Sequence, residues 1–173
     1  DSEIASILLI GHDGKLRITH AVGLPDDVVK DTVLDKGEAI SGHVVETGTA
    51  VLIQDIEADP RFQRRNHERY YTHSAISVPV RIHGRVTGVI NVNNKRTRQP
   101  YREEDLRLVE AIAGHAAVAL FNAQRYEETL RRAQCDSLTG LANHGHFWSV
   151  LHVELQRAAR YSRELAVVVV DID

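Results

Sequence analysis

The chain has 173 residues, enough for one domain or for one domain and part of a second. Apolar residues make up 43% of the sequence and charged residues 26%, which is the composition of a folded globular protein rather than a disordered one. Lys and Arg number 21 and Asp and Glu number 24, a formal net charge of −3, so the charge balance predicts no nucleic-acid partner.

Cys135 is the only cysteine, which rules out an intrachain disulfide and a CxxC metal or redox site. Uninterrupted apolar runs are short beside the ~20 residues of a bilayer-spanning helix, so the sequence predicts no membrane span. It also shows no signal peptide, and we expect a cytoplasmic protein. Because the sequence contains no Met, we expect it to be a piece of a longer protein.

Two hairpins are predicted from alternating apolar and polar residues. The first covers residues 4–22, and the second covers residues 75–92 with a two-residue turn at His83-Gly84. Pro79 lies inside the second hairpin, and because proline cannot donate to a strand ladder, an edge or a bulge is expected there.

A helix and a long polar segment are predicted between the hairpins. Asp35 is the expected helix cap and Gly48 the expected C-terminal stop. A short strand follows over residues 51–54. Residues 55–74 are polar and contain Pro60, so they are expected to form an irregular connection.

From residue 102 the apolar residues recur at helical spacing, and the pattern continues through Gln134. A second amphipathic helix is expected over about residues 147–161, and an apolar strand over residues 166–170. A lone strand leaves its backbone groups without partners, so residues 136–173 are not expected to form a complete domain.

Several stretches of the first part of the chain carry a family pattern. They are residues 37–44 (GEAISGHV), 46–56 (ETGTAVLIQDI), 59–62 (DPRF), 77–80 (SVPV), 88–92 (GVINV) and 101–105 (YREED). With these stretches, residues 1–122 resemble a GAF domain, a small-molecule-sensing module. The resemblance implies an α+β fold with an antiparallel sheet flanked by helices and a long C-terminal signalling helix; the family's first helix would precede Asp1.

The last part of the chain carries two further motifs in order. Residues 136–143 read DSLTGLAN, and some thirty residues later an apolar stretch ends in Asp171-Ile172-Asp173. These motifs resemble the start of a GGDEF domain, the diguanylate cyclase module. The resemblance implies a helical linker over residues 123–135 and a truncated GGDEF helix–strand unit over residues 136–173. Its opening-motif residues would be Asp136, Leu138, Thr139, Gly140, Leu141 and Asn143.

The resemblance implies that the longer protein condenses two GTP to cyclic di-GMP, with Mg²⁺ held by Asp171 and the Ile172 carbonyl. Each GGDEF domain would hold one GTP, so two domains must meet and a homodimer is implied. The present chain lacks the GGDEF hairpin, contains no catalytic residue and should be inactive. The alternative is a non-catalytic binding and dimerisation module with a degenerate GGDEF domain.

The resemblance further implies that the loop over residues 59–73 covers a ligand pocket. The candidate pocket residues are Arg61, His67, Tyr70, Tyr71 and His73, beside further arginines at 64, 65 and 69. Such side chains suit an anionic or aromatic ligand, which stays unidentified. The alternative is a solvated loop that covers the sheet.

Part of a cyclic-nucleotide GAF signature is also present. Asn94-Lys95 is followed by Tyr101 and Asp105, but Leu106 departs from the signature. Cyclic-nucleotide binding therefore stays open as a further alternative.

Alternating spacings of three and four along the long helix predict the seam of a two-stranded coil. Its residues are Leu106, Val109, Ala113, Ala116, Leu120, Ala123, Glu127 and Leu130, of which Glu127 weakens the seam. A second stripe, formed by Leu108, Ile112, His115 and Ala119, is expected to be able to face the sheet.

Overall fold

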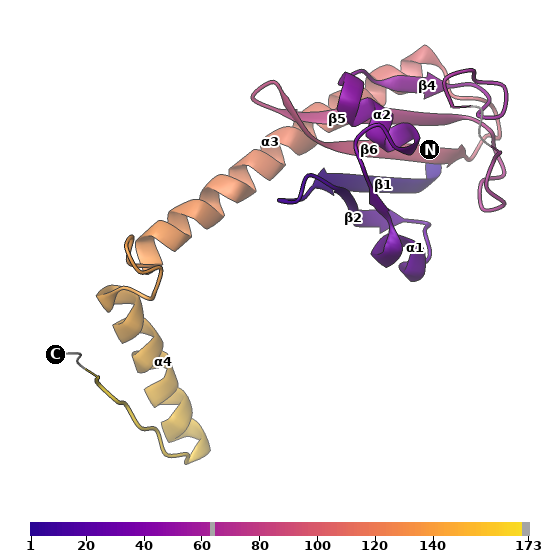
Figure 1. Ribbon diagram of the computed structural model, residues 1–173. Coiled ribbons are helices and arrows are strands. Elements are labelled where there is room, and N and C mark those ends of the chain that lie inside the picture. Colours follow the sequence, from indigo (N-terminus) through magenta and orange to yellow (C-terminus); the bar gives the residue numbers. More distant parts are fainter. Residues whose placement is uncertain (63–64, 171–173) are drawn as a thin grey trace. The chain divides into compact units, whose positions relative to one another are not determined.

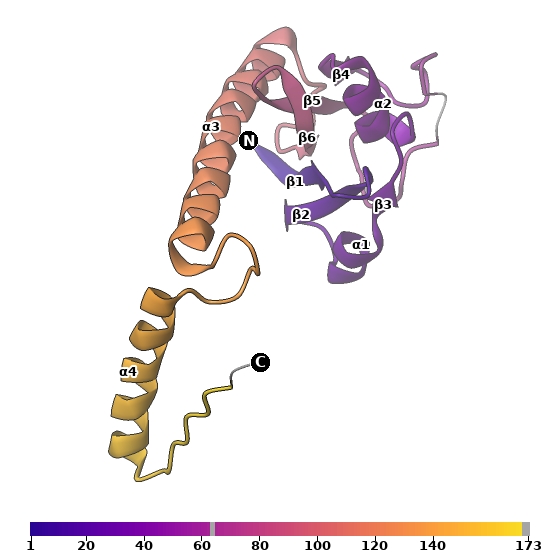
Figure 2. The same cartoon turned by 60° about the vertical axis from the view of Figure 1, so that its left-hand side comes forward.

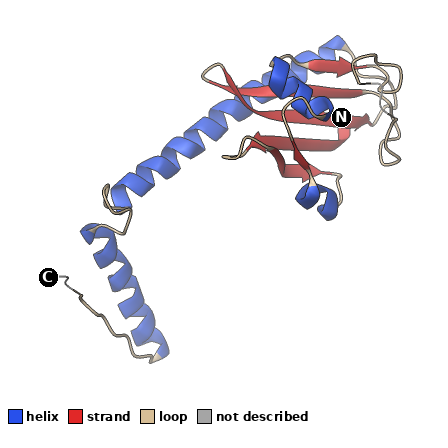
Figure 3. Ribbon diagram, viewed as in Figure 1, coloured by secondary structure: helices blue, strands red, loops and turns tan. Residues whose placement is uncertain are grey.

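The computed structural model describes residues 1–62 and 65–170 and divides the chain into two compact units, Asp1–Phe121 and Asn122–Asp173. The first unit contains a six-stranded antiparallel sheet with the strand order β3-β2-β1-β6-β5-β4 (Figures 1 and 3). The strands are β1 Ser2–Ile10, β2 Leu16–Val22, β3 Val33–Leu34, β4 Val51–Ile53, β5 Ala75–Ile82 and β6 Arg85–Lys95. The helices are α1 Asp26–Asp31, α2 Ala39–Thr47, α3 Glu103–Gln134 and α4 His144–Tyr161. The predicted α+β class is confirmed.

Both predicted hairpins form, as β1–β2 and β5–β6. His83 and Gly84 connect β5 to β6 with φ angles of 49° and 78°, as a tight hairpin turn requires. Pro79 pairs with β6, whereas β4 pairs only with residues 75–77, so the other side of β5 is a sheet edge at Pro79. A register shift between Val80 and Arg81 follows, so the expectation of an edge or bulge is met.

Helix α2 begins later than expected. Its N-cap is Glu38, and no side chain caps it. Asp35, the expected cap, instead forms a turn before the helix, because its N–H donates to the Glu38 carboxylate and its carbonyl accepts the Glu38 N–H. Gly48 ends the helix at a φ of 68°, as predicted. Sequence reasoning had not identified α1 or β3.

The sheet is apolar on both faces, and a different helix covers each face (Figure 2). Ala75 and Val89 pack in a cluster with residues of α2. Ile76 and Val78 of β5 belong to the opposite face of the sheet from Ala75 and pack in a second cluster with α3. The alternation of side chains along β5 and β6 therefore requires two covering helices.

The structure corrects the face of α3 that was assigned to the dimer seam. Val109 and Ala113 are buried against the chain's own sheet, and other seam residues up to Leu120 pack beside them. The second stripe is the exposed one: Leu108 is 60% exposed and Ile112 50% exposed. Small alanines bring α3 close to the sheet, which explains why the alanine-rich stripe, and not the leucine–isoleucine stripe, faces inward.

Helix α3 is the one helix in the described part of the chain that is long and apolar enough to cross a membrane. Helices that pack on soluble domains meet the same criteria, and α3 packs on its sheet through Val109, Ala113 and Ala117. The absence of a membrane span stays a prediction.

In the second unit, α4 forms as expected, starting three residues earlier than predicted. Residues 166–170, predicted as a strand, have no regular secondary structure and are exposed. No strand in the described part of this unit offers them hydrogen-bond partners, so their β-forming sequence has nothing to pair with.

Two glycine substitutions test the packing of the sheet. A Cβ at Gly88 of β6 would overlap the Leu8 carbonyl oxygen of β1, whereas a Cβ at Gly114 of α3 would meet nothing within 4 Å. Gly88→Ala should lower the free energy of unfolding by about 1–3 kcal/mol, and Gly114→Ala should raise it by roughly 0.5–1 kcal/mol. Urea unfolding measures both; equal effects would contradict the close approach of β1 and β6.

Candidate functional site

A cavity of about 190 Å³ lies on the α2 face of the sheet. Alternate residues of the strands form its floor, including Ser6 of β1, Ser77 of β5 and Asn91 of β6. The start of α2, several residues of the segment 65–74, and Leu24 and Ile56 complete its lining. Apolar side chains such as Ile4, together with the polar floor, give it the mixed lining of a small-molecule site.

A hydrogen-bond network of four side chains organises the floor. Ser77 Oγ donates to Asn91 Oδ1 at 2.7 Å, and Asn91 Nδ2 donates to Ser41 Oγ at 3.0 Å and to Ser6 Oγ at 3.4 Å. Ser6, Ser41 and Ser77 are all buried. Buried polar groups cost stability unless they are bonded, so this network fixes the floor across three strands and α2.

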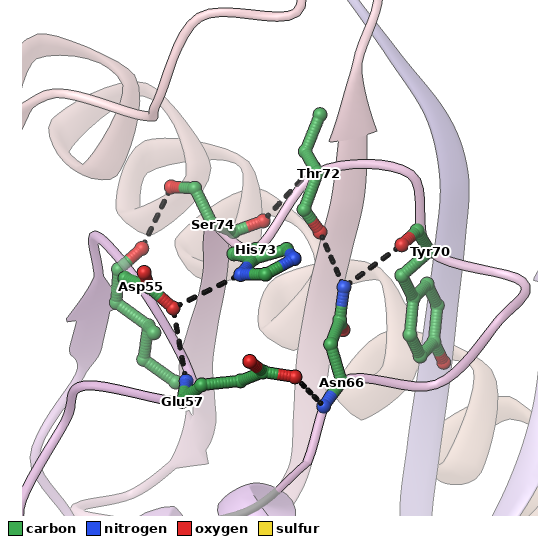
Figure 4. Close-up of polar contacts among 8 residues, drawn as sticks. Asp55, Glu57, Asn66, Tyr70, Thr72, His73 and Ser74 are labelled. Carbon is green, nitrogen blue, oxygen red and sulfur yellow. Dashed lines mark hydrogen bonds and ion pairs between the residues drawn. The ribbon is translucent and has the colours of Figure 1, made fainter.

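The loop side of the cavity is held by a second set of polar contacts (Figure 4). Asn66 Nδ2 donates to the Tyr70 carbonyl at 2.8 Å, and the Asn66 N–H donates to the Glu57 carboxylate at 2.9 Å. His73 Nδ1 lies 3.1 Å from Asp55 Oδ1. The pKa of Asp55 is lowered, first by the Glu57 N–H and also by His73. The loop is therefore ordered by its own contacts.

The structure brings three of the five candidate pocket residues to the cavity. His67, Tyr70 and His73 line it. Arg61 lies outside the lining and bonds Asp59 and the Leu52 carbonyl, which ties the loop to β4. Tyr71 is also outside the lining, and the Arg98 guanidinium carbon lies over its ring, 5.3 Å from the ring centroid. Of the further arginines, Arg65 lines the cavity and Arg64 lies outside the described residues.

Sequence reasoning missed the cavity floor. The floor residues occupy inward positions of strands that are otherwise apolar, such as Ser77 in β5 and Asn91 and Asn93 in β6. Polar residues spaced by two within an apolar strand were the available signal, because they share one face of the sheet.

Asn94 anchors the loop that covers the cavity. It is 3% exposed, and its side-chain amide donates to the Arg69 carbonyl at 3.1 Å and accepts from the Thr72 N–H at 3.5 Å. The partial signature residue Asn94 therefore has a structural role in the loop.

Tyr101 joins the cavity region to the start of α3. Ser74, which lines the cavity, accepts the Tyr101 N–H at 2.9 Å and donates to the Ile53 carbonyl at 2.7 Å. Gln54 donates to the Tyr101 carbonyl at 3.0 Å, and Ser2 bonds the Tyr101 hydroxyl at 2.7 Å. We refer to these bonds from Ser2, Gln54 and Ser74 as the Tyr101 contacts.

A partly buried ion pair fixes the first turn of α3. Lys95 Nζ bonds Asp105 Oδ2, which also accepts the Arg102 N–H at 2.8 Å. Burial raises the pKa of Asp105, but the bonds from Lys95 and from the Arg102 N–H outweigh it and leave the pKa below its ordinary value. The carboxylate therefore stays charged at neutral pH.

In the second unit the predicted opening motif forms a compact loop between α3 and α4. Asp136 Oδ1 accepts the Thr139 N–H at 2.9 Å and hydroxyl at 2.8 Å, and these bonds lower the pKa of Asp136. Asn143 Nδ2 donates to the Ala133 carbonyl at 2.7 Å, while its Oδ1 accepts the His146 N–H and caps α4. Leu138 and Leu141 are exposed, and Gly140 has a φ of 71°.

The predicted magnesium ligands Asp171 and Ile172 lie outside the described residues. Within residues 1–62 and 65–170, no group of three or more His, Cys, Asp or Glu side chains is placed to hold a metal ion. A magnesium site in this chain therefore stays a prediction from the sequence motif.

The GAF family model matches residues 1–120, which is more than half of the chain. The chain belongs to the GAF domain family. The matched region coincides with the sheet, the cavity and the first part of α3. Residues 121–173 lie beyond the matched region.

The chain is similar in sequence to regulatory proteins and to cyclic-nucleotide phosphodiesterases. A Nif-specific regulatory protein of Azospirillum lipoferum is 25% identical over 134 residues, which are 74% of this chain and 22% of that protein. A dual 3′,5′-cyclic-AMP and -GMP phosphodiesterase 11 of Drosophila melanogaster is 32% identical over 96 residues, which are 54% of this chain and 7% of that protein. The chain thus spans about a fifth or less of the length of these relatives.

Solved structures show the same fold. The GAF domain of an Acinetobacter phosphoenolpyruvate-protein phosphotransferase matches with a TM-score of 0.60 at 22% identity, over 72% of this chain and 74% of that chain. A type II free methionine-R-sulfoxide reductase of Thermoplasma acidophilum matches with a TM-score of 0.55 at 24% identity, over 67% of this chain and 77% of that chain. At this identity the likeness establishes the fold alone.

The Lys95–Asp105 pair should make the free energy of unfolding depend on pH. Because the folded pKa of Asp105 is lowered, the pair stabilises the fold above the unfolded Asp pKa of about 3.9 and loses this contribution as the pH falls below it. Asp105→Asn should cost about 1 kcal/mol at pH 7 and almost nothing near pH 2, measured by urea unfolding. Glu104→Gln, the matched control in the same turn, should show a smaller loss; equal losses would indicate a general helix-terminus effect.

Proposed function

We propose that residues 1–121 form a sensor that binds a small molecule in the cavity and transmits binding to α3. The observation that carries this proposal is Ser74, which lines the cavity while its hydroxyl bonds Tyr101 just before α3. A ligand that moves residues 65–74 acts on the Tyr101 contacts directly. The expected location is cytoplasmic.

Cyclic nucleotides are a second candidate class of ligand. The Drosophila relative is a cyclic-AMP and cyclic-GMP phosphodiesterase, and Asn94, Lys95, Tyr101 and Asp105 match part of the corresponding signature. In this chain these four residues hold the loop and the start of α3, so the signature is explained without a nucleotide. Direct binding of cyclic AMP and cyclic GMP, measured by calorimetry, separates the two classes.

The output that we propose is synthesis of cyclic di-GMP from two GTP by a longer protein. The DSLTGLAN motif and the DID triplet support this output. The exposed apolar residues 167–170 also support it, because a buried parallel strand of a larger domain has this composition. Mg²⁺ would be held by Asp171 and the Ile172 carbonyl, and the metal would supply charge stabilisation for phosphoryl transfer. The alternative output is a degenerate GGDEF domain that only docks.

We also propose a homodimer through the exposed stripe of α3. Leu108, Ile112, His115 and Ala119 follow spacings of four, three and four, which is the pattern of a coiled-coil seam. From residue 111 to residue 124 the helix has no charged residue, although much of this length is exposed. An exposed, uncharged helix face is typical of an interface.

The metal assignment is testable in the longer protein. Asp171→Ala should reduce cyclic di-GMP synthesis from GTP and Mg²⁺ at least a hundredfold, because the metal loses a charged ligand. Ser162→Ala, outside the motifs, is the matched control and should keep full activity. Chromatographic product detection measures both; undiminished synthesis by Asp171→Ala would remove Asp171 from the metal site, and an inactive parent protein would favour the docking alternative.

The dimer face is testable with the present chain. Leu108→Lys combined with Ile112→Lys should raise the dimer dissociation constant tenfold or more in sedimentation equilibrium, because two lysines would have to be buried. Val22→Lys combined with Val33→Lys introduces the same charge at exposed valines of the sheet edge and should leave the dimer intact. A wild-type monomer, or a dimer that tolerates the α3 lysines, would contradict this interface.

A further inference from the structure

The permanent charge in the cavity lining is positive. Arg65 is positively charged and lines the cavity, and no Lys, Asp or Glu of the described residues does. Transferring a cation into such a site would leave its charge without a partner, which is costly. The lining therefore disfavours a cationic ligand.

The cavity floor offers hydrogen-bond donors. Ser6 and Ser41 are 7% and 6% exposed, and each hydroxyl oxygen accepts a bond from the Asn91 amide, so each hydroxyl hydrogen remains available for a further bond. Asn93 also lines the cavity, and its side chain makes no hydrogen bond with the described residues. These groups match a ligand rich in oxygen acceptors.

The start of α2 adds backbone donors to the same wall. Ala39, Ile40 and Ser41 line the cavity, and the first intrahelical bond is donated only by Gly42, to the Glu38 carbonyl at 2.8 Å. No side chain among the described residues caps the helix, and its first turn contains no acidic residue. The helix N-terminus therefore presents unpaired N–H groups and a partial positive charge beside the serine hydroxyls.

The size and apolar part of the cavity limit the ligand further. Its volume of about 190 Å³ is below the ~300–1,000 Å³ of pockets that take drug-sized molecules. Ile4, Ile40 and Ile56 line it as well and offer apolar contact for a short carbon skeleton.

We propose that the cavity selects a small organic acid, with its carboxylate toward the start of α2 and the floor serines, and its carbon skeleton against the isoleucines. This inference rests on the proposed sensor function and names the chemical class of its ligand.

A panel of matched compounds tests the inference with the full chain. Acetate, malonate and succinate are compared by calorimetry and thermal unfolding with acetamide, malonamide and succinamide, and with putrescine. At least one carboxylate should bind tenfold or more tighter than its amide, and putrescine should not bind. Preferential binding of an amide or of putrescine would overturn the anion inference and leave the sensor function standing. A chain that binds no member of the panel would also overturn the anion inference. If every other small molecule tested failed to bind as well, the sensor function would be overturned too.

Two charge substitutions locate the binding to the cavity. Asn93→Asp places a negative charge in the lining and should weaken the best carboxylate at least tenfold, whereas Gln99→Glu makes the same charge change on an exposed turn and should not. Arg65→Gln should weaken it about tenfold, and Arg85→Gln, at the exposed first residue of β6, should leave it unchanged. Circular dichroism verifies folding of each variant; equal effects of a variant and its control would place the acid outside the cavity and overturn the inference.

Discussion

The hydrogen bonds around Tyr101 connect the two layers of the sensor unit. Tyr101 is 3% exposed and belongs to the apolar cluster beneath α3, yet its backbone is bonded by Ser74 and Gln54, which follow β4 and precede β5. Burial raises the pKa of the Tyr101 phenol, so the hydroxyl stays neutral and keeps its bond to Ser2. The start of α3 is therefore tied to the strands that border the cavity.

The position of the cavity makes this connection necessary for signalling. The cavity lies on the α2 face of the sheet, whereas α3 packs on the opposite face, so a ligand cannot contact α3 through the sheet. The route around the sheet passes through two neighbouring pairs of residues. Asn94 holds the covering loop while Lys95 holds Asp105 of α3, and His73 lines the cavity while Ser74 bonds Tyr101. One pair contacts Tyr101 just before α3 and the other contacts Asp105 in its first turn, so both connect the loop to the start of α3.

Local patterns predicted most of the sensor fold, because the determinants are short in sequence. The His83-Gly84 turn, the Gly48 stop and the strand alternation each depend on a few adjacent residues. The face of α3 was not predictable in the same way, because two stripes had similar spacing. Which stripe is buried depends on the sheet, whose branched side chains such as Ile76 and Val80 accept small alanines at close approach.

The sequence predicted the loop side of the candidate site but not its floor. The loop residues His67, Tyr70 and His73 stand out in the sequence as a polar, aromatic segment. The floor residues come from three strands that are distant in sequence, and Ser6 and Asn91 meet only through the pairing of β1 with β6. A site assembled by strand register requires the register, which single-sequence patterns do not provide.

The loop after α3 is held to both α3 and α4 by side-chain hydrogen bonds. Asn143 bonds the Ala133 carbonyl near the end of α3 and caps α4 through the His146 N–H, so one side chain contacts both helices. Asp136 holds the intervening turn through the backbone and hydroxyl of Thr139. An amide suits position 143, because one amide can donate to the Ala133 carbonyl and accept from the His146 N–H at the same time.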